Sequence, residues 1–259
     1  MGFSDYFNSM YVWAIGTLII IAALASYTLN TIPLNLILAV FLCCVIDILI
    51  KKIVLKKDLS FPKSAFITGL IIGSVGLLNF DILYVVIACL IAIGSKHVIR
   101  LKGRHIFNPA ALGLLVSLVL LSTGETWWAT TGFLLFGLTI PLTVFLIFAN
   151  YKADKLKIAI PAILLFGIVY FIEGYLKLTF TLNGILGALA VIPFFFIFIM
   201  LSEPKTSPYF AKEQLLFALG VVSLGLLLEY MKIFHPMFLA LLAGNLVYAI
   251  YRSRPNAGA

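Results

Sequence analysis

Long apolar runs separated by short loops are the feature that most constrains how this chain can fold. Several runs, such as residues 11–28 and 208–229, approach the roughly 20 residues that a helix needs to cross a bilayer. Of all residues, 63% are hydrophobic and 11% are charged, whereas soluble domains carry about 25% charged residues. A soluble domain of this size cannot bury so much apolar surface, so the sequence predicts an all-α polytopic membrane protein.

Ten transmembrane helices are predicted within a single transmembrane domain, residues 1–259. They cover residues 11–28, 32–50, 64–78, 82–99, 109–121, 127–150, 158–172, 183–201, 208–229 and 236–251. Two segments, 64–78 and 109–121, span about 20 Å at 1.5 Å per residue, less than the roughly 30 Å hydrocarbon core. We interpret them as half-helices shielded by neighbouring segments, because short segments often mark transport sites. Misplaced segment ends are the alternative.

A weak internal repeat is visible in residues 107–115 and 234–242. In each, a phenylalanine, a polar residue and a proline open an apolar segment, and the two copies are offset by about half the chain. The earlier copy enters the membrane from the cytoplasm and the later one from outside. The pattern therefore predicts an inverted repeat of five plus five helices, with repeat 1 at about 11–121 and repeat 2 at about 127–251.

The net charge of +8 is explained by membrane topology. When the apolar segments are numbered, 16 of the 18 basic residues fall in alternate loops, which leaves Lys177 and Lys232 for the other side. The positive-inside rule makes the basic side cytoplasmic. We expect a multi-pass protein of the plasma membrane in contact with membrane lipid, with the N-terminus and C-terminus cytoplasmic and no nucleic-acid partner.

Catalytic and metal-binding motifs are absent from the sequence. It contains no nucleophile triad and no phosphate-cradling glycine loop. Asp47 lies four residues before Lys51, where an ion pair along one helix is the simplest account. We interpret the three cysteines, Cys43, Cys44 and Cys89, as packing residues. We interpret the three histidines, His97, His105 and His235, as surface residues.

Two predicted cytoplasmic loops carry the most informative pattern. Asn108-Pro109 and Ser207-Pro208 each place an N-cap residue before a proline at the first helical position. Both loops would aim a helix N-terminus, with its free N–H groups and positive dipole end, at the same membrane face. Basic side chains beside two such ends would suit an anionic ligand, such as a phosphate, a carboxylate or a reduced flavin. Ordinary helix caps within basic loops are the alternative.

Four segments resemble the RnfD and NqrB family, whose members are membrane subunits of the Rnf complex and of the sodium-pumping NADH:quinone oxidoreductase. They are residues 64–70 (SAFITGL), 106–113 (IFNPAALG), 198–208 (FIMLSEPKTSP) and 243–246 (AGNL). The resemblance implies a ten-helix, inverted-repeat subunit that couples electron flow, from ferredoxin or NADH, to sodium or proton movement. It also implies other membrane and iron–sulfur subunits of an electron-transport complex as partners, and a flavin, FMN or riboflavin, or a quinone as cofactor.

In that family, FMN is typically joined by a phosphoester to a threonine in an outer loop, and Thr130 is the matching candidate. Trp127 and Trp128 replace the small residues expected there, so we expect a non-covalent flavin and interpret the two rings as interfacial tryptophans. The residues predicted to hold a flavin or quinone are Thr68, Gly69, Lys96, Asn108, Pro109, Lys205, Thr206 and Ser207. A solute channel or secondary transporter, and a scaffold subunit without cofactor, are the alternative functions.

The division of basic residues gives a first testable prediction. Single cysteines at positions 104 and 205, in a cysteine-free background, should be protected from a membrane-impermeant maleimide added outside the cell. Cysteines at positions 81 and 125 should react with it, because the loops that contain them face outward under the positive-inside rule. Labelling of position 104 or 205 from outside would contradict the topology.

Overall fold

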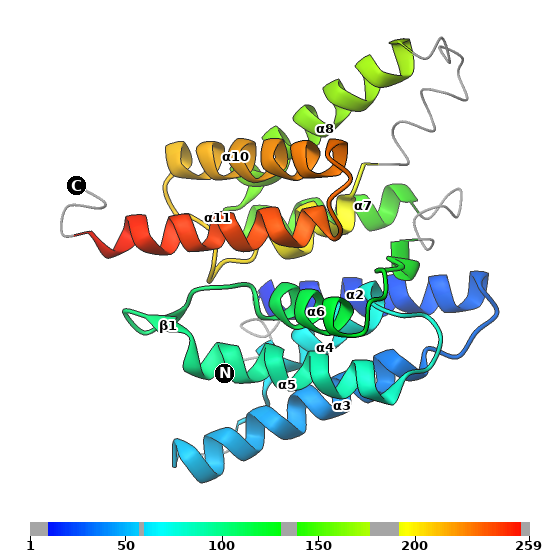
Figure 1. The fold of residues 1–259 in the computed structure, drawn as a ribbon, viewed down its shortest axis with the longest axis vertical. Helices are drawn as coiled ribbons and strands as arrows, with labels where there is room; N and C mark the ends of the chain where they lie inside the picture. The colour runs from blue at the N-terminus through cyan, green and yellow to red at the C-terminus, as the bar shows by residue number, and fades with distance from the viewer. Residues whose placement is uncertain (1–9, 57–59, 131–138, 177–191, 255–259) are drawn as a thin grey trace.

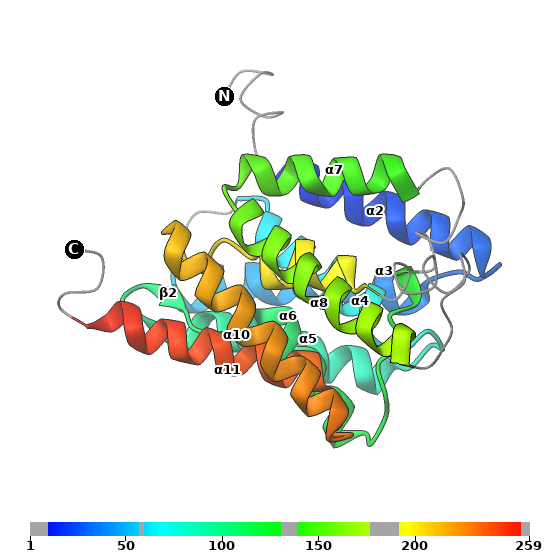
Figure 2. The same cartoon turned by 90° about the horizontal axis from the view of Figure 1, so that it is seen from above.

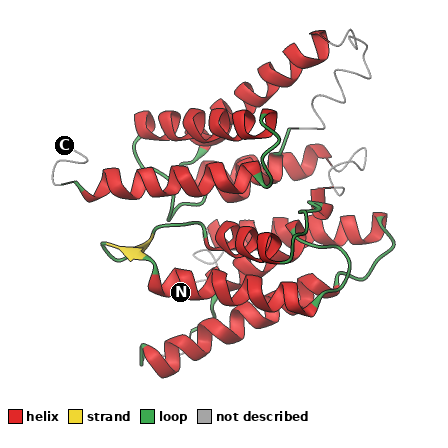
Figure 3. Cartoon of the chain, viewed as in Figure 1, coloured by secondary structure: helices red, strands yellow, loops and turns green. Residues whose placement is uncertain are grey.

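The computed structural model describes residues 10–56, 60–130, 139–176 and 192–254. In these residues the chain is all-α apart from one two-stranded hairpin, as the sequence predicts. The helices form two groups that follow one another along the chain, one in the lower and one in the upper part of Figure 1. Figure 3 shows how little of the described chain lies outside helices.

The first group, residues 10–120, holds the blue to green helices of Figure 1. Its elements are α2 (Met10–Thr28), α3 (Leu34–Leu49), the π-helical turn η1 (Ile50–Val54), α4 (Lys63–Val75), α5 (Ile82–Val98), β1 (Arg100–Leu101), β2 (Arg104–His105) and α6 (Pro109–Leu120). Within it, α3 packs on α4 and α5, α5 packs on α6, and α2 packs on α4.

The second group, residues 139–253, is built from α7 (Thr139–Lys152), α8 (Leu156–Leu176), the π-helical η3 (Phe196–Leu201), α10 (Ala211–Tyr230) and α11 (Pro236–Ser253). Here α8 packs on η3 and α10, α10 packs on α11, and α7 packs on η3. In the described part of the chain, the main helix contacts between the groups are α2 with α7 and α6 with α11. Figure 2 shows α7 lying along α2.

The described helices agree with the membrane interpretation. Three helical stretches are long and apolar enough to cross a membrane by length and composition: Tyr11–Thr28, Leu156–Gly174 and Ala211–Tyr230. Large apolar side chains are exposed on most of the long helices, for example Phe41 on α3, Leu164 on α8 and Val247 on α11. So much exposed apolar surface is unfavourable in water and is suited to lipid.

The structure refines several predicted segments. The segments at 64–78 and 109–121 are indeed short, because α4 has 13 residues and α6 has 12. The segment predicted at 127–150 differs, since residues 128–130 form a single 3₁₀ turn and α7 begins at Thr139. Of the segment predicted at 183–201, residues 183–191 lie outside the described residues, and its end is π-helical.

Two glycines set how closely α4 packs against α3. A Cβ added to Gly69 would lie 2.6 Å from the Cα of Val40, and one added to Gly73 would lie closer still to the Cα of Leu36. Residues four apart share one helix face, and small residues on such a face let two membrane helices approach closely. Gly69, predicted for the cofactor site, therefore faces the backbone of α3 and is used for packing.

We expect Gly73→Ala to lower the free energy of unfolding by about 1–3 kcal/mol, because the backbone of α3 must move to admit the methyl group. Gly220→Ala in α10 is the matched control, since a Cβ there meets nothing within 4 Å. It should leave stability unchanged or raise it slightly through helix propensity. Thermal unfolding of both variants in one detergent measures the difference, and equal stabilities would disprove the close α3–α4 contact.

Candidate functional site

A cavity lies between the two helix groups, bordered by α2, α4, the start of α6, the end of α7 and the η3 segment with the loop that follows it. Four of the predicted site residues line it: Thr68, Asn108, Pro109 and Lys205. The space measures about 820 Å³ with its open mouth included, and about 100 Å³ where a water molecule can be centred. That interior is large enough for several waters or for part of a ring.

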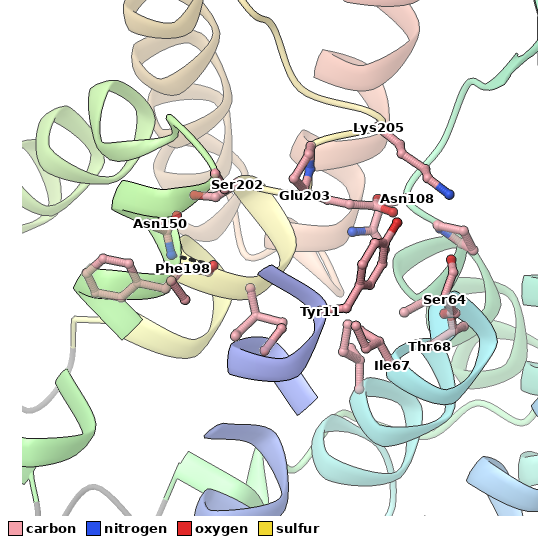
Figure 4. A pocket seen from close by; sticks show the side chains of 18 residues that line it. Tyr11, Ser64, Ile67, Thr68, Asn108, Asn150, Phe198, Ser202, Glu203 and Lys205 are labelled. Atoms are coloured by element: carbon pink, nitrogen blue, oxygen red, sulfur yellow. Dashed lines mark hydrogen bonds between the residues drawn. The ribbon is translucent and has the colours of Figure 1, made fainter. Parts of the chain in front are cut away.

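Figure 4 shows how the polar side chains are distributed around the cavity. Ser64 and Thr68 project from α4 on one side, and Asn150 of α7 lies on the opposite side. Glu203 and Lys205 extend from the loop after η3. The remaining lining is mostly apolar, so a few polar groups converge on an otherwise apolar space, as in most ligand sites.

The side-chain amide of Asn245 on α11 joins the two predicted loops. Its Oδ1 accepts the backbone N–H of Asn108 at 2.9 Å, and its Nδ2 donates to the carbonyl of Thr206 at 3.3 Å. Asn108 in turn donates from Nδ2 to the carbonyl of Met200 at 3.2 Å. The three residues Asn108, Thr206 and Asn245 are at most 2% exposed, so these bonds replace water for groups that would otherwise be unsatisfied.

The Asn108 prediction is confirmed as a helix cap. Its Oδ1 accepts the N–H of Ala111 at 3.0 Å, and Pro109 occupies the first turn of α6. The preference of asparagine for this position and of proline for the first turn explains why α6 begins here. The side chain of Asn108 is thus used mainly to cap α6 and to hold Met200.

The second helix start was predicted in the wrong place. Ser207-Pro208 does not open a helix, because α10 begins at Ala211 after Phe210, which has extended backbone angles. Ser207 Oγ instead donates to the carbonyl of Glu203 at 2.7 Å, and Thr206 Oγ1 donates to Glu203 Oε2 at 2.9 Å. These bonds close a turn, so of the two predicted helix starts only that of α6 lies at the cavity.

Lys96 does not line the cavity. Its Nζ lies 3.2 Å from Asp47 Oδ1, and the same carboxylate contacts Lys51 at 2.6 Å and His97 at 2.8 Å. Asp47 is fully buried and its ion pair with Lys51 is present as predicted, but the contacts from α5 were missed. The sequence contained a clue, since a single acid within an apolar segment usually has several partners.

All three histidines were interpreted as surface residues, and this was wrong. His105 and His235 are 4% and 5% exposed, and each contacts a glutamate. The His97 side chain is 10% exposed. Each imidazole contacts a carboxylate on another part of the fold, and no pattern along the sequence places these partners together.

Thr130, the candidate for covalent flavin attachment, lies away from the cavity lining. Its Oγ1 donates to the carbonyl of Trp127 at 2.7 Å. Trp128 is 3% exposed and donates from Nε1 to the carbonyl of Gly73 at 2.7 Å, while Trp127 stacks on Phe238 at 5.4 Å. The two rings are therefore packed against neighbouring helices.

Asn150 forms part of the wall of the cavity. Asn150 Nδ2 donates to the carbonyls of Leu146 and Phe198, both at 3.0 Å, which fixes the orientation of the amide. Its Oδ1 is buried, and no donor among the described residues reaches it. Lys205 supplies a cation on the wall of the same cavity. Sequence reasoning missed Asn150.

A buried lysine, Lys155, contacts the far end of the loop that follows η3. Lys155 is 1% exposed, donates from Nζ to the carbonyl of Pro208, and lies 4.9 Å from the ring of Tyr209. Arg104 of β2 lies 5.0 Å from the same ring. Burial lowers the pKa of Lys155 to about 8, because its ammonium loses hydration; Asp154 opposes this shift and Arg104 adds to it.

Comparison with known proteins adds no relative: no family model matches the chain, and no curated protein matches it. The resemblance described above therefore depends on the motif residues and on how they are arranged in space.

The lowered pKa of Lys155 gives a pH prediction. Between about pH 8 and pH 10.5 the unfolded chain binds a proton that the folded chain lacks. The free energy of unfolding of the wild type should therefore rise with pH relative to Lys155→Met, by at most about 1.4 kcal/mol per pH unit. Lys157→Met is the control, because the Lys157 side chain is 55% exposed. Denaturant unfolding across this range measures it, and parallel curves for the wild type and Lys155→Met would contradict the burial of a charged lysine.

Proposed function

We propose that the chain is a membrane subunit of an ion-translocating electron-transport complex, similar to the RnfD protein of Rnf complexes, and that the cavity binds a flavin or a quinone. One observation carries this proposal. The four segments on which the resemblance rests are far apart in the sequence, yet residues of three of them line the cavity: Ser64 and Thr68, Asn108 and Pro109, and Phe198, Ile199 and Ser202 to Lys205. The fourth supplies Asn245, which bonds to both loops.

The packing of helices supports an inverted repeat of five plus five. We pair α2 with α7, α3 with α8, α4 with η3, α5 with α10 and α6 with α11. Under this pairing, the contacts α3–α4, α5–α6, α3–α5 and α2–α4 of the first group match α8–η3, α10–α11, α8–α10 and α7–η3 of the second. The two main contacts between the described parts of the groups, α2–α7 and α6–α11, join each element to its own counterpart. Contacts of this kind are expected where two related halves meet at a pseudo-two-fold axis.

The distribution of charge supports the proposed orientation, with ten spans and both termini in the cytoplasm of a plasma-membrane protein. Basic residues from separate predicted cytoplasmic loops meet at one end of the molecule. Arg252 donates to the carbonyls of His105 and Lys205, both at 3.4 Å, and Arg104 and Lys155 contact the same tyrosine ring. Such a concentration at one end is what the positive-inside rule requires.

The chemistry proposed for the cavity uses few groups. A bound flavin supplies electron transfer, a chemistry that cofactors rather than ordinary side chains provide. Asn150 borders the ligand space, and its bonds to the carbonyls of Leu146 and Phe198 keep that wall fixed. Lys205 stabilises negative charge on the ligand, and Ile67 and Ile71 of α4 exclude water from its ring. A low effective dielectric strengthens the attraction of Lys205 for such charge.

A solute transporter is the second candidate. The observation that favours it is the position of the cavity, which lies between the two groups and is bordered by the short α4 and the π-helical η3. Transporters with inverted repeats place their substrate sites beside short or interrupted helices.

Titration of the purified protein with riboflavin, FMN and a short-chain quinone separates the candidates. We expect the wild type to bind at least one of them, and Lys205→Met to bind it about tenfold more weakly, as the loss of one charge-assisted contact of about 1.5 kcal/mol implies. Lys157→Met should bind like the wild type, because Lys157 is exposed and lies outside the cavity lining. A wild type that binds none of these ligands, but carries a small solute across vesicle membranes, favours the transporter.

A further inference from the structure

A groove on the surface of the molecule runs between α10 and α11. The two helices are joined by residues 231–235 and spread apart from that loop, as Figure 2 shows. The space between them measures about 600 Å³ where a water molecule can be centred, and about 1210 Å³ with its open side included. The smaller of these volumes falls in the range of about 300–1,000 Å³ that ligand sites occupy.

Small residues leave the centre of the groove open. α10 contributes Leu216, Gly220 and Leu224, spaced by four residues, and α11 contributes Ala243 and Val247 in the same way. A Cβ added to Gly220 would meet nothing within 4 Å. Leu216 on one rim and Val247 on the other are 62% and 67% exposed. An open apolar space with exposed apolar rims is suited to contact with a lipid chain.

The length of the groove matches one leaflet of a bilayer. From Lys212 to Leu224 its wall on α10 spans about 18 Å at 1.5 Å per residue. One leaflet contributes about half of the roughly 30 Å hydrocarbon core. The wide end of the groove, at Pro208 and Tyr251, lies at the end of the molecule that carries the predicted cytoplasmic loops. A chain in the groove would therefore belong to the cytoplasmic leaflet.

Three basic side chains lie at this wide end. Lys212 lines the groove, and Arg252 lies 5.7 Å from the ring of Tyr248, which also lines it. Arg104 is close enough for its charge to act on both Arg252 and Tyr248. In the part of the chain that the structure describes, none of the three cations forms an ion pair with a carboxylate. Because like charges repel, an anion placed among them would be stabilised.

The acids near the wide end leave this excess of positive charge in place. Glu213 lines the groove next to Lys212. Glu203 lies 3.4 Å from His105, and Asp154 lies 3.8 Å from Lys157, so these two carboxylates already have basic partners. One carboxylate therefore faces the three cations, and the wide end of the groove favours an anionic group.

We propose that the groove holds an acyl chain of an anionic phospholipid, with the headgroup phosphate among Lys212, Arg104 and Arg252. Basic pockets between helices on the cytoplasmic side are suited to anionic headgroups, and arginine binds phosphate through paired N–H groups. A transmembrane helix in the groove would cover its apolar walls but leave the cations without an anion, whereas a phospholipid satisfies both parts. This inference goes beyond the proposed function, because it concerns the outer surface and holds whatever the cavity binds.

The test measures lipid binding to the full chain, purified in detergent, by native mass spectrometry. The probes are dioleoyl phosphatidylglycerol and dioleoyl phosphatidylcholine, which have the same chains and differ in net charge. We expect one phosphatidylglycerol to bind about tenfold more tightly than phosphatidylcholine, and Lys212→Gln to weaken its binding about fivefold, as the loss of one basic residue near a headgroup implies. Lys157→Gln is the matched control and should bind like the wild type, because Lys157 is exposed and lies outside the groove lining.

A second variant tests the apolar part of the groove. Gly220→Phe should weaken the binding of both lipids about tenfold, because its ring occupies the space of the chain. Gly16→Phe on α2 is its control, since a Cβ there also meets nothing within 4 Å, and it should bind both lipids like the wild type. Thermal unfolding of each variant establishes that it is folded, and Lys212→Gln tests the proposal independently if Gly220→Phe is not.

Three results would overturn the proposal. Equal binding of the two lipids by the wild type, or an equal loss in Lys212→Gln and Lys157→Gln, would show a general attraction to the basic face and no site. Unchanged lipid binding by a folded Gly220→Phe variant would show that the chain does not enter the groove. A dimer of the wild type that Gly220→Phe dissociates would show that a second copy of the chain fills the groove.

Discussion

The side chain of Asn245 is the interaction on which the arrangement around the cavity most depends. It is 1% exposed and bonds to both loops, through the N–H of Asn108 and the carbonyl of Thr206. Arg252 also reaches both loops, but its bonds are long, at 3.4 Å, and only partly buried. Without Asn245, two backbone groups buried at a helix start and a turn would lose their partners, at about 1–3 kcal/mol each. The amide therefore holds α6 and the loop after η3 in register with α11, from which it projects.

Buried amides repeat this role elsewhere in the chain. Asn35 on α3 donates to the carbonyls of Leu77 and Asn79 and accepts the N–H of Asp81, which fixes the turn between α4 and α5. Gln214 on α10 donates to the carbonyls of Asp154 and Tyr209. An amide can satisfy irregular backbone in an apolar environment without introducing a net charge, which would be costly in a membrane. Loops held in this way can remain short and still border a cavity.

The elements that depend on local sequence could be predicted, and those that depend on distant partners could not. The apolar runs and the Asn108-Pro109 cap placed α6, and the two short helices followed from the lengths of their runs. Ser207-Pro208 has the same local pattern, but its side chains bond back to Glu203, so the helix starts later. The contacts of Asp47 with Lys96, of His105 with Glu203 and of Asn150 with Phe198 join different elements, so no spacing along the chain reveals them.

Hydrogen–deuterium exchange of wild type and Asn245→Leu, compared in the same detergent, tests the role of this amide most directly. Leucine keeps the approximate size of the side chain and removes both hydrogen bonds. The account predicts faster exchange in residues 106–113 and 200–208 together, and unchanged exchange in residues 84–93 of α5, which make neither of these bonds. Unchanged exchange in both loops, or acceleration confined to one of them, would contradict the claim that Asn245 holds the two sides of the cavity together.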